Sequence, residues 1–155
     1  MKSFQGSTIS KLDSSGRLKL PPNVVADFKG VDATGKVVLK LQPEGAIAIL
    51  PANVFGPTSS PDASAQDYLG SAAARIRLRR EMLFVVSDEI SQQGRLTLPA
   101  SFIKRIGVAA GDDVAIIGIS FGYEIWKPET LEAEMDEELE QGRRLYDQAR
   151  EQLTE

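Results

Sequence analysis

Residues 12–21 read Leu12-Asp13-Ser14-Ser15-Gly16-Arg17-Leu18-Lys19-Leu20-Pro21, and residues 90–99 read Ile90-Ser91-Gln92-Gln93-Gly94-Arg95-Leu96-Thr97-Leu98-Pro99. Each stretch has an apolar residue, three small or polar residues, Gly-Arg, Leu-x-Leu and a closing proline. The glycines and the arginines of the two stretches are both 78 positions apart. Self-similarity at a fixed period indicates a repeated structural unit. The sequence therefore predicts a duplicated unit in which both copies keep a loop that carries an arginine.

The first stretch has the chemistry of a tight turn between two strands. Asp13 can accept hydrogen bonds from nearby backbone, and Gly16 can adopt the positive φ that such turns need. Residues 7–12 and 18–20 are predicted to be strands that form a hairpin, which places Arg17 just past the hairpin tip.

Both copies predict the same order of elements: strand, loop, strand, short helix, strand, turn and strand. In the first strand we expect Ile9 and Leu12 near the buried side, and the imperfect alternation allows a bulge. The other predicted elements are strands over 36–41, 46–50, 85–90, 96–98, 114–117 and 123–126, a helix from Pro22 to a stop at Gly30, and a helix from Pro99 that is capped by Gly107. Repeats of about 50 residues are marginally stable alone, so we expect them to bury surface against each other or against other subunits.

The composition excludes several classes of chemistry. The chain contains no cysteine and no histidine. It therefore lacks a disulfide framework, a thiol nucleophile, the usual structural zinc ligands and the commonest general base. No apolar run reaches the roughly 18 residues of a membrane span, and the N-terminus has no signal-peptide pattern. We expect a cytoplasmic protein that is not an enzyme and needs no metal, cofactor, small-molecule substrate or membrane.

Charge is distributed unevenly along the chain, whose formal net charge is −4. Residues 1–41 contain seven Lys and Arg against three Asp and Glu, and residues 1–127 contain 15 against 12. Residues 128–155 reverse this balance, with three basic and ten acidic side chains. This pattern indicates a mildly basic body with an acidic tail, which permits a nucleic-acid partner without requiring one.

The segment between the two copies is predicted to be a linker followed by a helix. Gly56–Ser64 is rich in Pro, Ser and Gly. Apolar residues then follow at helical spacing, namely Ala65, Leu69, Ala72, Ala73 and Ile76. Three roles are open for the arginine cluster Arg75–Arg80: a solvent-exposed helix face, contact with phosphate, or pairing with the acidic tail.

The acidic tail is predicted to be a helix with a narrow apolar stripe. The stripe consists of Leu131, Met135, Leu139, Tyr146, Ala149 and Leu153. Gly142 weakens the helix near its middle. The helix either docks on this or a neighbouring subunit through the stripe, or projects freely. Tyr123 and Trp126, just before it, are expected to be core or interface residues.

The duplicated loops resemble those of the MraZ family of bacterial transcriptional regulators, which act on the division and cell-wall gene cluster. Other stretches are also similar to that family or to the wider AbrB-like DNA-binding fold: Phe4-Gln5-Gly6-Ser7-Thr8, the Ala-Arg-rich helix before the second copy, 106–114 and Tyr123-Glu124-Ile125-Trp126. The resemblance covers roughly residues 4–131.

This resemblance implies a mainly β fold with short helices. Each copy contributes half of a small swapped-hairpin AbrB-like barrel, and a connector helix and a C-terminal helix are added. The corresponding divisions are 5–53 for the first repeat, 54–83 for linker and connector, 84–128 for the second repeat and 129–155 for the acidic helix. It further implies a ring-like homo-oligomer, association with the nucleoid, and binding to short guanine-rich direct repeats in double-stranded DNA. The matching loop residues are Asp13, Arg17 and Arg95, while Ser91 stands where the family has an aspartate.

The chemistry of the loop fits such a role. An arginine guanidinium can bond guanine O6 and N7 together, and a β-ribbon can enter the major groove. Arg17 would make this contact and Asp13 would hold it in place. The predicted phosphate contacts are Ser14, Ser15, the exposed amide of Gly16, Lys11 and Lys19. Arg95 either contacts DNA or remains as scaffold. Because one loop reads few base pairs, specificity would need several linked loops.

Two other functional classes are compatible with parts of the sequence. The acidic tail resembles the neutralising tails of small antitoxin-like proteins, so a protein-binding module of the AbrB or MazE type is the main alternative. An enzyme would have to use carboxylates alone, because there is no phosphate loop, metal-ligand cluster or nucleophile-base pair.

Overall fold

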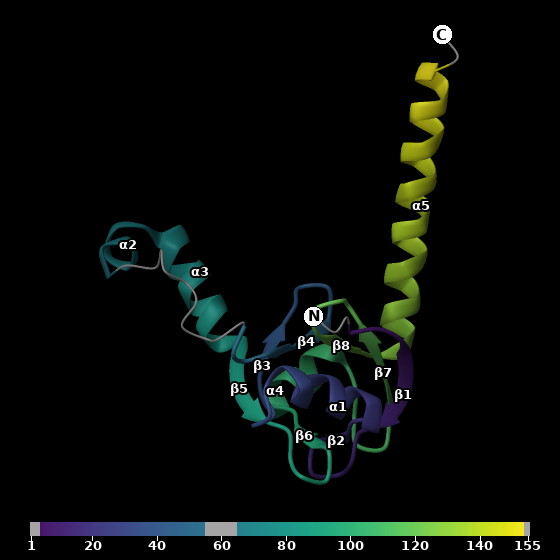
Figure 1. Ribbon diagram of the computed structural model, residues 1–155. Helices are drawn as coiled ribbons and strands as arrows, with labels where there is room; N and C mark the ends of the chain where they lie inside the picture. Colours follow the sequence, from purple (N-terminus) through teal and green to yellow (C-terminus); the bar gives the residue numbers. More distant parts are fainter. Residues whose placement is uncertain (1–3, 55–64, 154–155) are drawn as a thin grey trace.

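Figure 1 shows the computed structural model, which describes residues 4–54 and 65–153. The predicted linker Gly56–Ser64 lies outside these described residues. The fold is mainly β with short helices and one long C-terminal helix, as the sequence predicts. The strands are β1 (Ser7–Lys11), β2 (Arg17–Lys19), β3 (Lys36–Leu41), β4 (Ala46–Pro51), β5 (Val85–Glu89), β6 (Arg95–Thr97), β7 (Asp113–Gly118) and β8 (Tyr123–Trp126). The helices are α1 (Pro22–Val31), α2 (Ala65–Gly70), α3 (Ala72–Leu83), α4 (Ala100–Ile106) and α5 (Pro128–Leu153).

The larger sheet has six antiparallel strands in the order β1-β7-β8-β4-β3-β5. Each strand of one copy has an equivalent in the other: β1 with β5, β3 with β7, and β4 with β8. If each strand is replaced by its equivalent, the same order is obtained in the reverse direction, so a pseudo-twofold axis passes between β4 and β8. The first strand of each copy pairs with the third strand of the other copy. Neither copy therefore forms its part of the sheet alone.

A second, two-stranded ribbon is formed by β2 and β6, one strand from each copy. Leu18 pairs with Leu96, and both side chains are fully buried. The predicted hairpin between 7–12 and 18–20 is reduced to a single bridge between Leu12 and Leu18. The predicted pairing partner of residues 18–20 was wrong. These residues pair with β6 of the other copy, because the two equivalent leucines, Leu18 and Leu96, make their buried contact between the copies.

The short helices α1 and α4 pack on a core that also includes residues of the larger sheet and of the ribbon. Val24 and Phe28 form the buried face of α1, and Phe102 and Ile106 form that of α4. Each helix begins directly after a proline-containing turn, because the fixed φ of proline suits the first helical turn. Gly107 caps α4 with a φ of 81°, as predicted. The predicted stop at Gly30 is wrong by one residue, since α1 continues to Val31.

Tyr123 and Trp126 belong to the core of this chain, in agreement with the sequence. Tyr123 packs against the rings of Phe4 and Phe28, with ring centroids 5.5 and 5.7 Å away. Its hydroxyl donates to Asp27 Oδ2 at 2.6 Å. Burial, and then the neighbouring Asp27 carboxylate, raises the pKa of Tyr123 well above its usual value. The residue is therefore a structural element that ties β8 to α1.

The prediction that Ile9 faces the interior is wrong, because its side chain is 57% exposed. The register of β1 with β7 is continuous from Ser7 to Lys11, so no bulge is present there. Alternate residues of a strand share a face, which places Ile9 on the side opposite to buried Leu12. The half-buried positions of this strand are Thr8 and Ser10 instead.

The remaining helices extend away from this body on opposite sides in Figure 1. The predicted connector helix is divided, because α3 has its own N-cap at Ser71, whose hydroxyl accepts from the Ala74 N–H at 3.2 Å. Beyond the body, α5 runs through Gly142 without interruption, and none of its residues is fully buried. In the part of the chain that the structure describes, no helix combines the length and apolarity needed to cross a bilayer.

Candidate nucleic-acid interface

The loop between β1 and β2 is organised by the Asp13 carboxylate. Asp13 Oδ1 accepts the backbone N–H groups of Ser15 and Arg17, each at 2.8 Å. Asp13 Oδ2 lies 3.4 Å from Arg17 Nε, so the same carboxylate shapes the turn and holds the guanidinium. The Arg17 side chain is 44% exposed. The predicted Asp13–Arg17 contact is thus present, and it leaves the guanidinium open to solvent.

These contacts favour the charged form of Asp13. The pKa of Asp13 is lowered, chiefly by the Arg17 backbone N–H, with further contributions from the Ser15 N–H and the Arg17 and Arg95 charges. Burial opposes the shift but does not cancel it. The contribution from Arg95 indicates that the second loop lies close to the first.

We expect NMR titration to find the pKa of Asp13 below the ordinary aspartate value of about 3.9. A lowered folded-state pKa means that the contribution to stability is complete above about pH 4 and is lost as the pH falls through the folded pKa. In Arg17→Ala the backbone N–H remains, so the pKa should stay below the ordinary value. A normal pKa in the unaltered protein would contradict this geometry.

The second loop keeps the backbone geometry of the first but loses its carboxylate. Ser91 Oγ accepts the Arg95 N–H at 3.0 Å, which replaces one of the two bonds that Asp13 accepts. The Ser91 N–H donates to the Arg95 carbonyl at 2.9 Å, and the Asp13 N–H donates to the Arg17 carbonyl at the same distance. Serine therefore suffices for the turn. It has no charge with which to hold Arg95.

The two loops are fixed against each other by reciprocal contacts. The Leu20 N–H donates to the Gly94 carbonyl at 2.8 Å, and the Leu98 N–H donates to the Gly16 carbonyl at 2.9 Å. Gly16 and Gly94 have φ values of 76° and 78°, which side-chain-bearing residues rarely adopt. A Cβ at Gly94 would also lie 3.2 Å from Val25 of the opposite copy's helix. Both glycines are therefore needed for the loops to lie side by side.

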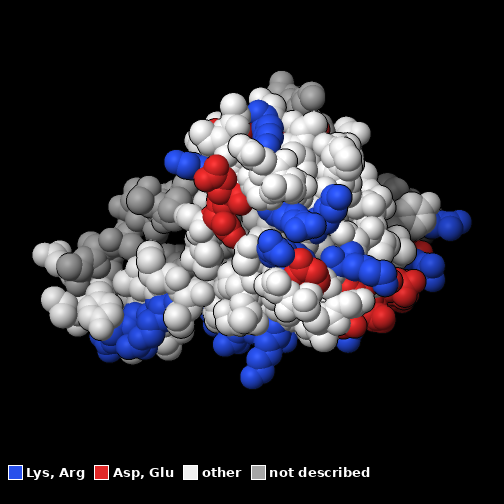
Figure 2. All heavy atoms as spheres, turned by 90° about the horizontal axis from the view of Figure 1, so that it is seen from below, with Lys and Arg blue, Asp and Glu red and all other residues white. Residues whose placement is uncertain are grey.

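The outer face of the ribbon carries three cationic side chains. Because the leucine pair faces inward, the alternate positions face outward, and these are Arg17, Lys19, Arg95 and Thr97. In the ribbon's register Lys19 lies opposite Arg95, and Arg17 lies opposite Thr97. Figure 2 views this end of the molecule from below and shows Lys and Arg side chains gathered near the middle of the face, with Asp and Glu among them. Three cations from two repeats thus share one small exposed surface.

The other predicted contact residues have different surroundings. Lys11 Nζ lies 3.3 Å from Asp113 Oδ1, so Lys11 is engaged with the neighbouring strand although its side chain is 74% exposed. Ser14 and Ser15 lie exposed at the turn. The predicted role of the Gly16 amide needs correction, because this N–H donates to the Asp13 carbonyl at 3.2 Å within the turn.

Thr97 was not among the residues predicted from the sequence. It is the equivalent of Lys19 in the second copy, and the ribbon's register places it opposite Arg17. The 78-residue spacing between the copies could have identified Thr97, because two strands related by a twofold axis must pair around equivalent residues. The Asp113 partner of Lys11 could not have been found in this way, since it depends on the register between β1 and β7.

Two curated proteins are similar to the chain over most of its length. A protein of Oleidesulfovibrio alaskensis named "Transcriptional regulator MraZ" is 28% identical over 138 residues, which cover 84% of this chain and 85% of that protein. A protein of Gluconacetobacter diazotrophicus with the same name is 26% identical over 152 residues, covering 94% and 91%. A comparison with models of known protein families finds no match. Together with the duplicated Gly-Arg loop, the two matches support the assignment of the chain to the MraZ family.

Proposed function

We propose that the protein is a sequence-specific, double-stranded DNA-binding transcriptional regulator. It acts as a repressor of the division and cell-wall gene cluster and reads short guanine-rich direct repeats. The names of both relatives support a regulator of transcription. The observation that carries the proposal is the outward face of the β2–β6 ribbon, where Arg17, Lys19 and Arg95 lie together.

The ribbon has the form and chemistry of a major-groove reader. A two-stranded β-ribbon fits the groove, and a guanidinium can bond guanine O6 and N7 at once. Asp13 fixes Arg17 at its Nε side, which leaves the terminal nitrogens for a base. Restricting the side chain before binding reduces the conformational entropy that the contact would cost. We assign base reading to Arg17 and phosphate contact to Lys19, Ser14 and Ser15.

Arg95 is assigned a secondary role on the same surface. It lies opposite Lys19 in the ribbon, so a duplex that meets Arg17 also passes close to Arg95. Without a carboxylate partner in Ser91, its guanidinium is less restrained and better suited to phosphate than to one base. Lys11 contributes weakly, because Asp113 competes with phosphate for its charge.

We further propose that several chains act together, as a ring-like homo-oligomer associated with the nucleoid. One ribbon covers few base pairs, and linked ribbons gain affinity through their effective concentration when the DNA carries repeats at matching spacing. Direct repeats, in contrast to palindromes, suit reading heads that follow one another in the same orientation.

An antitoxin-type partner binder is the second candidate, and exposure of α5 favours it. No residue of this helix is fully buried, and Met135, Leu139, Leu145, Tyr146 and Leu153 are exposed along it. An acidic helix with exposed apolar residues can neutralise a basic protein partner.

A binding selection from random duplex DNA tests the leading function. We expect enrichment of short guanine-containing boxes that recur at a fixed spacing, together with a multi-subunit mass in solution. Enrichment of single boxes would contradict the linked-reader mechanism. If no sequence is enriched while a basic protein co-purifies through α5, the partner-binding candidate replaces the DNA-binding one.

A further inference from the structure

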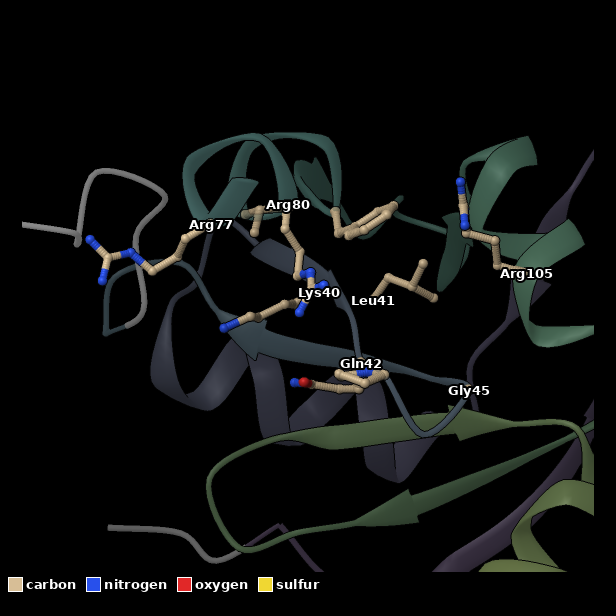
Figure 3. Close-up of a pocket in the computed structure, with 10 residues that line it drawn as sticks. Lys40, Leu41, Gln42, Gly45, Arg77, Arg80 and Arg105 are labelled. Carbon is tan, nitrogen blue, oxygen red and sulfur yellow. The ribbon is translucent and has the colours of Figure 1, made fainter. Parts of the chain in front are cut away.

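A cationic pocket lies away from the ribbon, between α3, the β3–β4 turn and α4 (Figure 3). Its volume is about 580 Å³. Among the residues that the structure describes, the lining consists of Lys40, Leu41, Gln42, Pro43, Gly45, Arg77, Arg80, Phe84, Val85 and Arg105. Four of these residues are basic and none is acidic. The pocket collects cations from β3, α3 and α4, which are far apart in the sequence. Such a surface favours an acidic occupant.

The pocket also offers apolar contact. The Arg105 guanidinium lies over the Phe84 ring, 4.9 Å from its centroid, which orders both side chains at the pocket wall. On the adjoining helix α3, Ile76 and Leu83 are 56% and 67% exposed. Arg80 lies four residues after Ile76 and three before Leu83, so the three share one face of the helix. An occupant that combines acidic and apolar side chains would therefore satisfy this surface.

The α5 helix of the same sequence has this combination. Residues 129–140 contain seven acidic side chains and no basic one. Met135 and Leu139 are exposed one helical turn apart in this segment, at 47% and 66%. At 26 residues the helix is about 39 Å long, whereas the 12 residues of α3 span about 18 Å. Charge and exposed apolar surface thus complement the pocket face.

The arrangement of the chain selects a second copy as the source of this helix. In Figure 1, α3 and α5 leave the body on opposite sides and point apart, so α5 does not lie on the α3 of its own chain. Parallel pairing of two α5 helices through the same stripe would bring their acidic segments together, and such like-charge contact is unfavourable. A basic face on one copy and an acidic face on another avoid both problems.

We propose that the acidic half of α5 docks on the α3–pocket face of a second copy. The two contact surfaces differ, so the interface is heterologous and repeats from chain to chain until a ring closes. The ribbon lies at the lower end of the molecule in Figure 1, away from both helices, and remains exposed in this assembly. The inference rests on the oligomer that is part of the proposed function, and it specifies which surfaces form that oligomer.

Charge reversal tests the interface in the full-length chain. Arg77→Glu with Arg80→Glu should weaken self-association by at least about tenfold, as measured by sedimentation, because each reversal replaces attraction by repulsion. Glu132→Lys with Glu138→Lys should have the same effect, since these positions flank Met135 one turn before and after it. All four changes in one chain should restore the parental mass.

A matched control separates the interface from total charge. Arg143→Glu with Arg144→Glu makes the same change in net charge on a part of α5 where both arginines lie near Glu140. This control should leave the assembly at its parental mass or strengthen it. The inference would be overturned if the control lost as much self-association as Arg77→Glu/Arg80→Glu, or if the four-fold variant failed to reassemble. In either case the oligomer of the parent protein would have to form through other surfaces. A monomeric parent would overturn the inference and the oligomer of the proposed function together, whereas DNA binding by the ribbon is tested separately.

Discussion

Arg17→Ala is expected to abolish sequence-specific DNA binding and to leave the oligomer intact. A bidentate contact between arginine and guanine contributes about 1–3 kcal/mol of discrimination, which corresponds to roughly fivefold to more than a hundredfold per loop. The loss is multiplied when several ribbons bind one operator. Titration of operator and random duplexes would measure it. The difference between the two affinities should disappear.

Two controls accompany this variant. Arg143→Ala removes an exposed arginine from α5 and should retain operator preference. Arg17→Ala itself should keep the parental mass and thermal unfolding, because Asp13 still accepts two backbone N–H groups after the side chain is removed. A variant that binds operator DNA as well as the parent does would remove Arg17 from the mechanism.

Leu18→Ala is expected to have the largest effect on stability. Leu18 is fully buried and pairs with Leu96 at the centre of the ribbon, so its removal leaves a cavity shared by both repeats. Truncation of a buried leucine costs about 2–5 kcal/mol, a large part of the roughly 5–15 kcal/mol that stabilises a typical domain. Denaturant unfolding would measure the change.

The neighbouring residue provides the comparison. Lys19→Ala lies on the exposed face of the same strand and should change the free energy of unfolding by no more than about 0.5 kcal/mol. Equal destabilisation by the two substitutions would mean that the ribbon's inward face does not form the core contact described above.

Local sequence patterns predicted most elements because their signals are short-ranged. Proline and glycine mark the ends of α4, and strands β3 and β8 follow from their apolar residues and adjacent turns. The pairing of β2 with β6 could not be predicted in the same way, because it depends on packing between residues 78 positions apart. Ile9 was misplaced for a related reason: an apolar residue on an edge strand does not by itself indicate which face is buried.

In the candidate site, too, local contacts could be predicted and contacts that depend on strand register could not. The contact between Asp13 and Arg17 is local, so turn chemistry and side-chain charge were sufficient to anticipate it. The proximity of Lys19 and Arg95 requires the register of the ribbon. The ion pair that engages Lys11 requires the register of β1 with β7. Contacts that depend on strand register carry no signature in either strand alone.

The most direct test of base reading combines Arg17→Ala with removal of the atom that Arg17 is proposed to contact. Replacing each guanine of the selected box with 7-deazaguanine removes the N7 acceptor and keeps Watson–Crick pairing. The parent should lose affinity for the altered operator, while Arg17→Ala should bind both operators equally, which gives a coupling energy of about 1 kcal/mol or more per box. Equal losses in parent and variant would show that Arg17 does not read guanine.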